Sequence, residues 1–269
     1  MKQNGEFQNQ PLISENICDD GKYLWFTEYD YNALFKIDKR NMTVIYVGCF
    51  PEEKFMQERL FASNVLYDEK IYFAPYMAND IAVYDIKKGI FKKHEIPLES
   101  KELYTVYGNT KFFCTLAAEH EIYFIPDHYP GILCYNIKED KFTCFSDWIN
   151  VIEKIRVNNW GYFSGSVRVN NKFIFSCACA DAVVIFDILT KQAKVMPMKN
   201  HKFNYGCEYS GICYVDGYFY LITGNGTIIK RRLENEYEEI KKIKLIVSDK
   251  NVVSFYPIHY RNGYLYLFP

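Results

Sequence analysis

An aromatic strand core recurs six times along the 269-residue chain, and this repeat constrains the fold more than any other feature. The six cores lie at residues 24–26, 71–73, 122–124, 173–175, 219–221 and 265–267. Their first residues are 47, 51, 51, 46 and 46 positions apart. This period fits the blades of β-propellers and is too long for leucine-rich or ankyrin repeats. The repeat therefore predicts an all-β fold of the propeller class.

Each aromatic core has the same neighbours. A turn with Asp, Asn or Gly precedes five of the six, as at residues 216–217 and 262–263, and a stretch of small and apolar residues, such as 165–169, lies before the turn. A third segment with an Asp or Asn near its end follows, as at 83–86, and then a more polar fourth segment, as at 43–47. Four strands per copy predict four-stranded antiparallel blades.

The sixth copy ends at Pro269, directly after its second strand. We therefore expect five complete blades and an incomplete sixth. No linker rich in Pro, Gly or Ser and no block of charge divides the chain, so we expect one β-propeller domain over residues 1–269. Either the chain is truncated or a partial blade closes the propeller, and an exposed edge there would favour pairing with another chain. A β-sandwich, or two stacked domains, is the alternative architecture.

The first copy carries a family resemblance. Residues 20–28 and 32–38 resemble the repeat of virginiamycin B lyase and similar propellers, and the repeat in general form resembles the NHL and kelch superfamilies. The other copies keep only the aromatic core and the ending of the third segment. The resemblance implies blade architecture. Lyase activity would call for a His/Glu constellation with magnesium near the channel in late blades, and no motif here carries those roles residue by residue. We therefore expect no metal and no cofactor.

Composition excludes some classes of partner. The formal net charge is −1 and the Lys and Arg residues are dispersed, so neither a nucleic acid nor an anionic membrane is indicated as a partner. The first ten residues are polar, and the chain has no apolar run of 18 residues, so we expect a cytoplasmic protein. Nine cysteines in no framework spacing indicate buried free thiols. The sequence leaves the oligomeric state open.

Ligand-binding residues are expected on one face of the propeller. In this strand order, the loops after the second and fourth strands of each blade share one face around the central channel. The candidates on that face are Glu28, Tyr29, Tyr76, Asp127, His128, Arg156, Trp160, Asp181, His201, Tyr205 and Glu208, with His259 of the sixth copy as a secondary candidate. Segments 51–60 and 147–158 are predicted to form short helices on the rim. The second of these places Trp148, Ile152 and Ile155 at helical spacing.

Two functions remain open. Aromatic and arginine anchors are typical of binding surfaces, which favours a non-catalytic propeller that binds a protein, peptide or glycan through the loop face. With 48 aromatic residues, however, some reach loops by chance. The alternative is a propeller enzyme, a lyase or hydrolase that uses charged channel residues. Asp127 and His128, beside His201 and Glu208, could supply a metal site or an acid–base pair, although their spacing matches no local signature. No catalytic residue is assigned.

Overall fold

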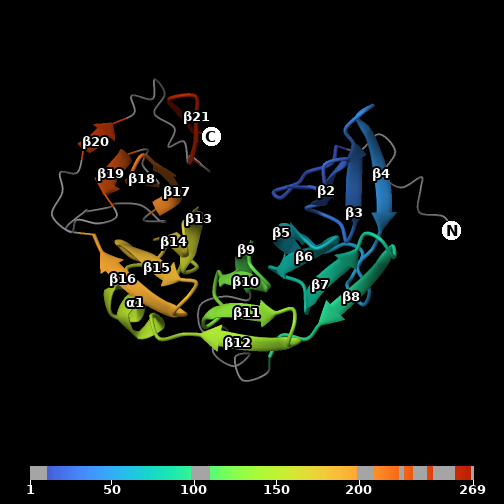
Figure 1. Cartoon of the computed structure of the whole chain (residues 1–269), viewed down its shortest axis with the longest axis horizontal. Coiled ribbons are helices and arrows are strands. Elements are labelled where there is room, and N and C mark those ends of the chain that lie inside the picture. Colours follow the sequence, from blue (N-terminus) through green and yellow to red (C-terminus); the bar gives the residue numbers. More distant parts are fainter. Residues whose placement is uncertain are drawn as a thin grey trace. The chain divides into compact units, whose positions relative to one another are not determined.

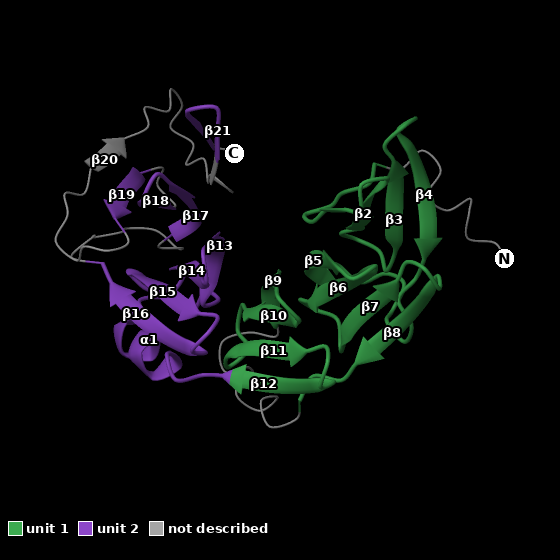
Figure 2. Ribbon diagram, in the orientation of Figure 1, with its two compact units in different colours: residues 1–144 green, residues 145–269 purple. Residues whose placement is uncertain are grey.

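The structure is a computed structural model that describes residues 11–97, 110–198, 209–223, 227–232, 241–244 and 258–267 (Figure 1). The chain divides into two compact units, residues 1–144 and 145–269, and each is described by itself (Figure 2). The expectation of one domain over the whole chain stays a prediction. In the described residues, no helix has the length and apolar character needed to cross a membrane.

Unit 1 holds three four-stranded antiparallel sheets, each with its strands in chain order. The first contains β1 (Cys18–Asp19), β2 (Tyr23–Thr27), β3 (Leu34–Asp38) and β4 (Thr43–Gly48). The second contains β5 (Phe61–Tyr67), β6 (Lys70–Pro75), β7 (Ile81–Asp85) and β8 (Ile90–His94), and the third contains β9 (Phe112–Ala118), β10 (Glu121–Pro126), β11 (Ile132–Asn136) and β12 (Lys141–Phe145). The first strand of the second sheet, β5, packs beside β1 and β9.

Unit 2 continues the same pattern after a short helix, α1 (Ile149–Ile155). One sheet contains β13 (Phe163–Val169), β14 (Lys172–Cys177), β15 (Ala182–Asp187) and β16 (Gln192–Pro197). The next contains β17 (Tyr209–Val215), β18 (Tyr218–Thr223), β19 (Thr227–Arg232) and β20 (Lys241–Lys244), and β21 (Ile258–Arg261) pairs with β22 (Tyr264–Leu267). Five four-stranded sheets and a partial one confirm the predicted fold class.

The aromatic core of β6 is buried because this second strand lies between two neighbouring sheets of unit 1, whereas Tyr266 of the sixth copy is 44% exposed. In β6, Tyr72 belongs to the apolar cluster shared with the third sheet, and Phe73 to the cluster shared with the first sheet. Successive side chains of a strand point to opposite faces, so a strand buried on both faces needs an unbroken apolar run. This is why the repeat shows an aromatic triplet and no alternation of apolar and polar residues.

The Asp or Asn at the end of the third strand has a structural role that explains its recurrence. Its Oδ1 accepts hydrogen bonds from backbone N–H groups of the turn that follows. Asp38 accepts the N–H of Arg40 at 3.0 Å, and Asp85 accepts the N–H of Lys88 at 2.9 Å. In the same way, Asn136 Oδ1 accepts the N–H groups of Lys138 and Glu139, and Asp187 Oδ1 accepts those of Leu189 and Thr190. A short polar side chain that bonds the backbone two or three residues ahead stabilises a turn.

Replacing Asp187 is expected to destabilise the turn that follows β15. Asp187→Ala removes two backbone hydrogen bonds, of 2.9 and 3.0 Å, and should cost about 1 kcal/mol in chemical denaturation. Asp187→Asn, the residue type found at Asn136, is the control and should retain most of the stability. The hydrogen bond from the Thr190 amide lowers the pKa of Asp187, so the wild-type advantage over Asp187→Asn should fade as the pH falls below about 4. An unchanged midpoint for Asp187→Ala would contradict this role.

One predicted helix is confirmed and the other is wrong. The helix expected at 147–158 is α1, with Trp148 and Ile152 buried. Segment 51–60 forms turns and no helix. Glu52 and Arg59 have φ angles of 65° and 51°, in the left-handed region that an α-helix excludes. The Nδ2 group of Asn32 also donates hydrogen bonds to the backbone carbonyls of Phe50 and Glu53, at 2.9 and 3.0 Å.

Candidate functional site

The loops at one end of the unit 1 sheets surround an open pocket of about 480 Å³. The pocket residues come from the β2–β3 loop, the segment before β5 and the β6–β7 loop, and they are Tyr29, Met56, Gln57, Glu58, Arg59, Tyr76 and Met77. Two of the residues predicted from the sequence, Tyr29 and Tyr76, thus lie at one pocket. Loops that follow the second strands of neighbouring blades do converge within this unit.

Arg59 joins the two loops through its backbone. Its N–H donates to the carbonyl of Tyr29 at 2.6 Å, and its own carbonyl accepts the N–H of Met77 at 3.2 Å. The side chain is also held, because Nε donates to Glu15 Oε2 at 2.6 Å and the guanidinium lies 4.0 Å from the centre of the Tyr76 ring. An arginine stacked on an aromatic ring and paired with a carboxylate is strongly oriented.

Tyr76 connects the pocket to the third sheet. Burial raises the pKa of Tyr76, and the charge of Asp127 raises it further, so the phenol is protonated at neutral pH. The nearby Thr110 side chain partly offsets this rise of the Tyr76 pKa, and the Thr110 hydroxyl donates to Asp127. His128 Nδ1 lies 2.7 Å from Thr110 Oγ1 and 2.9 Å from Asp127 Oδ2. The predicted residues Tyr76, Asp127 and His128 are therefore brought together in unit 1.

Glu28 is held by the backbone of its own loop. Its carboxylate is buried and accepts three backbone N–H groups, from Ile13 at 3.2 Å, Asp30 at 2.6 Å and Tyr31 at 2.7 Å. A carboxylate with three such donors is part of the local backbone structure. Glu28 therefore shapes the β2–β3 loop and so places the neighbouring Tyr29, but it does not line the pocket.

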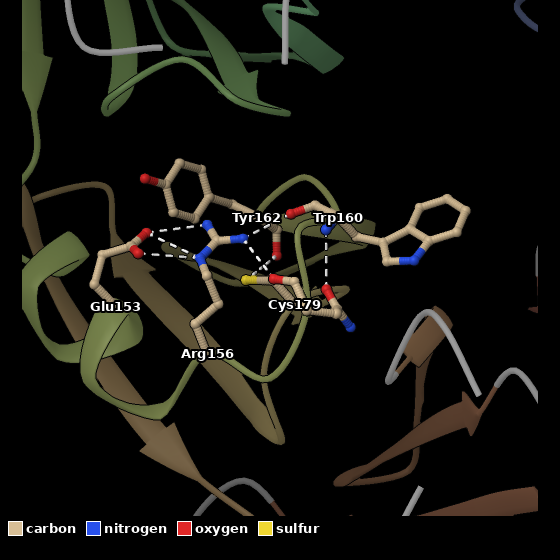
Figure 3. A network of polar contacts seen from close by, with 6 residues as sticks. Glu153, Arg156, Trp160, Tyr162 and Cys179 are labelled. Atoms are coloured by element: carbon tan, nitrogen blue, oxygen red, sulfur yellow. Dashed lines mark hydrogen bonds and ion pairs between the residues drawn. The ribbon is translucent and has the colours of Figure 1, made fainter. Parts of the chain in front are cut away.

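In unit 2, Arg156 is enclosed in a polar network (Figure 3). Its Nε and Nη2 donate to the Glu153 carboxylate at 3.0–3.1 Å, and Nη1 donates to the carbonyls of Asn158 at 3.2 Å and Trp160 at 2.8 Å. The guanidinium also lies 4.9 Å from the centre of the Tyr162 ring. These contacts fix the loop after α1. The indole of Trp160 points away from the network and is 53% exposed.

The structure describes the other predicted residues to different extents. Asp181 Oδ1 accepts the hydroxyl proton of Tyr209 at 2.5 Å, a contact inside unit 2. His259 lies on β21 opposite Tyr266 in the strand register, and its side chain is outside the described part. His201, Tyr205 and Glu208 lie outside the described residues. Within the residues that the structure does describe, no three His, Cys, Asp or Glu side chains are grouped so as to hold a metal ion.

Comparison with known proteins finds the same fold. No protein-family model matches the sequence, and no curated protein matches it significantly. Among solved structures, streptogramin B lyase has a TM-score of 0.64 at 14% identity, over 95% of this chain and 76% of that chain. BamB from Moraxella catarrhalis has a TM-score of 0.52 at 11% identity, over 93% of this chain and 65% of that one.

A third similar structure is the nidogen/laminin complex, with a TM-score of 0.52 at 10% identity, over 87% of this chain and 81% of that chain. These structures are β-propeller proteins, so the resemblance of the repeat to propellers of the streptogramin lyase type is confirmed at the level of fold. They include a lyase and proteins of other kinds. At such identities the likeness establishes the fold and no particular activity.

Proposed function

We propose that this protein is a non-catalytic β-propeller that binds a protein, peptide or glycan in the pocket between Tyr29, Arg59 and Tyr76. One observation carries the proposal: two tyrosines and an oriented arginine border an open pocket of about 480 Å³. Ligand sites commonly have volumes of this order, and Tyr and Arg are enriched among residues that dominate binding energies.

The charged groups around the pocket favour binding over catalysis. The Glu28 carboxylate is occupied by backbone amides, and Glu15 is paired with Arg59. Both carboxylates are thus already engaged with groups of the protein itself. The pocket thus has recognition groups in fixed positions, and this arrangement suits a ligand that is bound and released without chemical change.

A specific contact supports the alternative, a lyase or hydrolase. Asp127 and His128 lie 2.9 Å apart at Oδ2 and Nδ1, and Thr110 contacts both. A carboxylate that orients an imidazole is a common acid–base arrangement. Chemical change of a bound ligand, such as a cleaved peptide or an eliminated sugar detected by mass spectrometry, would establish this alternative in place of the binding proposal.

The test is a screen of the purified protein against peptide and glycan arrays, followed by titration of each hit. Tyr29→Ala should weaken a hit at least tenfold, because it removes one aromatic wall of the pocket. Tyr264→Ala is the matched control, since this exposed tyrosine follows the β21–β22 turn and is not among the candidate binding residues. An absence of hits, or equal loss with both variants, would count against this pocket.

A further inference from the structure

One edge of the Arg59 guanidinium, formed by its two Nη groups, can recognise a ligand. Among the described contacts, its guanidinium forms hydrogen bonds through Nε alone, to Glu15, and its side chain is 32% exposed at the pocket. The two Nη groups remain, and together they form the planar fork that a carboxylate engages with two parallel hydrogen bonds. The pocket therefore offers a pair of donors on a charged group.

The position of this edge is fixed before any ligand arrives. Arg59 has φ 51°, a left-handed conformation that is uncommon for a residue with a Cβ, and its backbone is bonded to both pocket loops. Stacking on Tyr76 and the bond to Glu15 hold the rest of the side chain. A side chain that is already ordered loses little rotamer entropy on binding, which strengthens each new contact. Strained backbone is typical of functional loops.

The other walls of the pocket narrow the class of ligand. Glu58 is exposed at the same pocket and Glu15 is paired with Arg59, so each negative charge on a ligand is opposed, and a group with a single charge is favoured over a phosphate or a polyanion. Met56, 74% exposed, and Met77 add flexible apolar surface of the kind that accommodates varied side chains of peptides. Sugars offer fewer apolar groups to two such methionines. One carboxylate beside an apolar side chain is the chemistry that fits.

We infer that the pocket recognises a peptide through one carboxylate, held by the Nη groups of Arg59, with an adjacent apolar side chain against Met56 and Met77. This inference rests on the proposed binding function and specifies its ligand. The carboxylate can come from a free C-terminus or from an Asp or Glu side chain. These two sources present the same group to the fork and differ in the neighbouring backbone.

Three pools of fluorescent hexapeptides test the inference by polarisation. The first has free C-termini and no Asp or Glu, the second is the same pool with C-terminal amides, and the third has C-terminal amides and one internal Glu. Binding of the first or third pool at least tenfold tighter than the second is expected, and it identifies the source of the carboxylate. Equal affinity for all three pools would overturn the inference while leaving the binding function standing. Tight binding of an oligouronate by the same pocket, without peptide binding, would also overturn it.

Variants then locate the contact. Arg59→Gln should weaken the binding of the carboxylate pool roughly 10- to 100-fold, as expected for the loss of a hydrogen-bonded charge, and should leave the affinity for the amide pool unchanged. Arg59→Lys, which keeps the charge without the fork, should be intermediate. Arg40→Gln is the matched control, because Arg40 pairs with Asp38 after β3, at the β3–β4 turn. Equal loss of both pools in Arg59→Gln, with a melting temperature equal to wild type, would show that Arg59 only shapes the pocket and would overturn the inference.

Discussion

Trp148→Ala is expected to lower the free energy of unfolding of unit 2 by about 3–5 kcal/mol, the range for removing a buried aromatic side chain. Trp148 is 1% exposed and precedes α1. Its ring packs edge-on against Tyr162, with centroids 5.0 Å apart, and lies 4.9 Å from Phe163 at the start of β13. Nε1 also donates to the carbonyl of Phe145 at 3.0 Å. The substitution removes all of these contacts and leaves a cavity.

Two control variants separate packing from the hydrogen bond. Trp148→Phe keeps an aromatic ring in place and loses the Nε1 bond, so it should cost about 1–2 kcal/mol. Trp160→Ala removes an exposed indole and should change stability by less than about 0.5 kcal/mol. Chemical denaturation followed by circular dichroism measures all three variants without depending on tryptophan emission. A loss below about 1 kcal/mol for Trp148→Ala would show that α1 is not anchored by this side chain.

The strands were predictable from the sequence because their determinants are local. A second strand buried on both faces requires the apolar triplet seen at Tyr72–Phe73 and its equivalents, and the third strand requires the turn-forming Asp or Asn. Type I′ turns require positive φ at both central residues, and Asp216 and Gly217 have φ 48° and 84°. Each of these signals lies within a few residues of the structure that it specifies.

Segment 51–60 was not predictable in the same way. Its residues permit a helix, but its conformation is set by Asn32, about 20 positions earlier, which donates to the carbonyl of Glu53 within the segment and to that of Phe50 directly before it. The bond between Glu15 and Arg59 spans 44 positions and also has no local signature. Tertiary contacts of this length override local propensity.

The candidate site shows the same limit. Tyr76, Asp127 and His128 were found because they follow second strands, whose positions the repeat fixes. Residue type alone could not separate recognition groups from structural ones. Glu28 and Arg156 are of the type that binds ligands, yet their polar atoms are used by backbone groups and by Glu153. Thr110, whose hydroxyl contacts both Asp127 and His128, has no sequence signal that would have selected it.

Asn32→Leu is expected to cost about 3 kcal/mol and to remove the pocket together with the stability. Asn32 is 1% exposed, and its side chain accepts the N–H of Phe50 at 2.7 Å and donates to the carbonyls of Phe50 and Glu53. Leucine has nearly the same shape but satisfies none of these groups, and each buried polar group left unpaired costs about 1–3 kcal/mol. Relaxation of the loop and entry of water recover part of that loss.

The effect on binding follows from where Asn32 acts. The segment that it holds supplies Met56, Gln57, Glu58 and Arg59 to the pocket, so ligand affinity should fall even at temperatures at which the variant is folded. Hydrogen exchange at the Phe50 amide reports the lost bond directly and should accelerate. Asn41→Leu is the control, because the exposed Asn41 side chain accepts a single amide, from Thr43 at 3.0 Å, in the β3–β4 turn, at the other end of β3 from the β2–β3 loop of the pocket. Protection of the Phe50 amide equal to wild type in Asn32→Leu would mean that the loop is held by other contacts, and the fixed position of Arg59 would then need another cause.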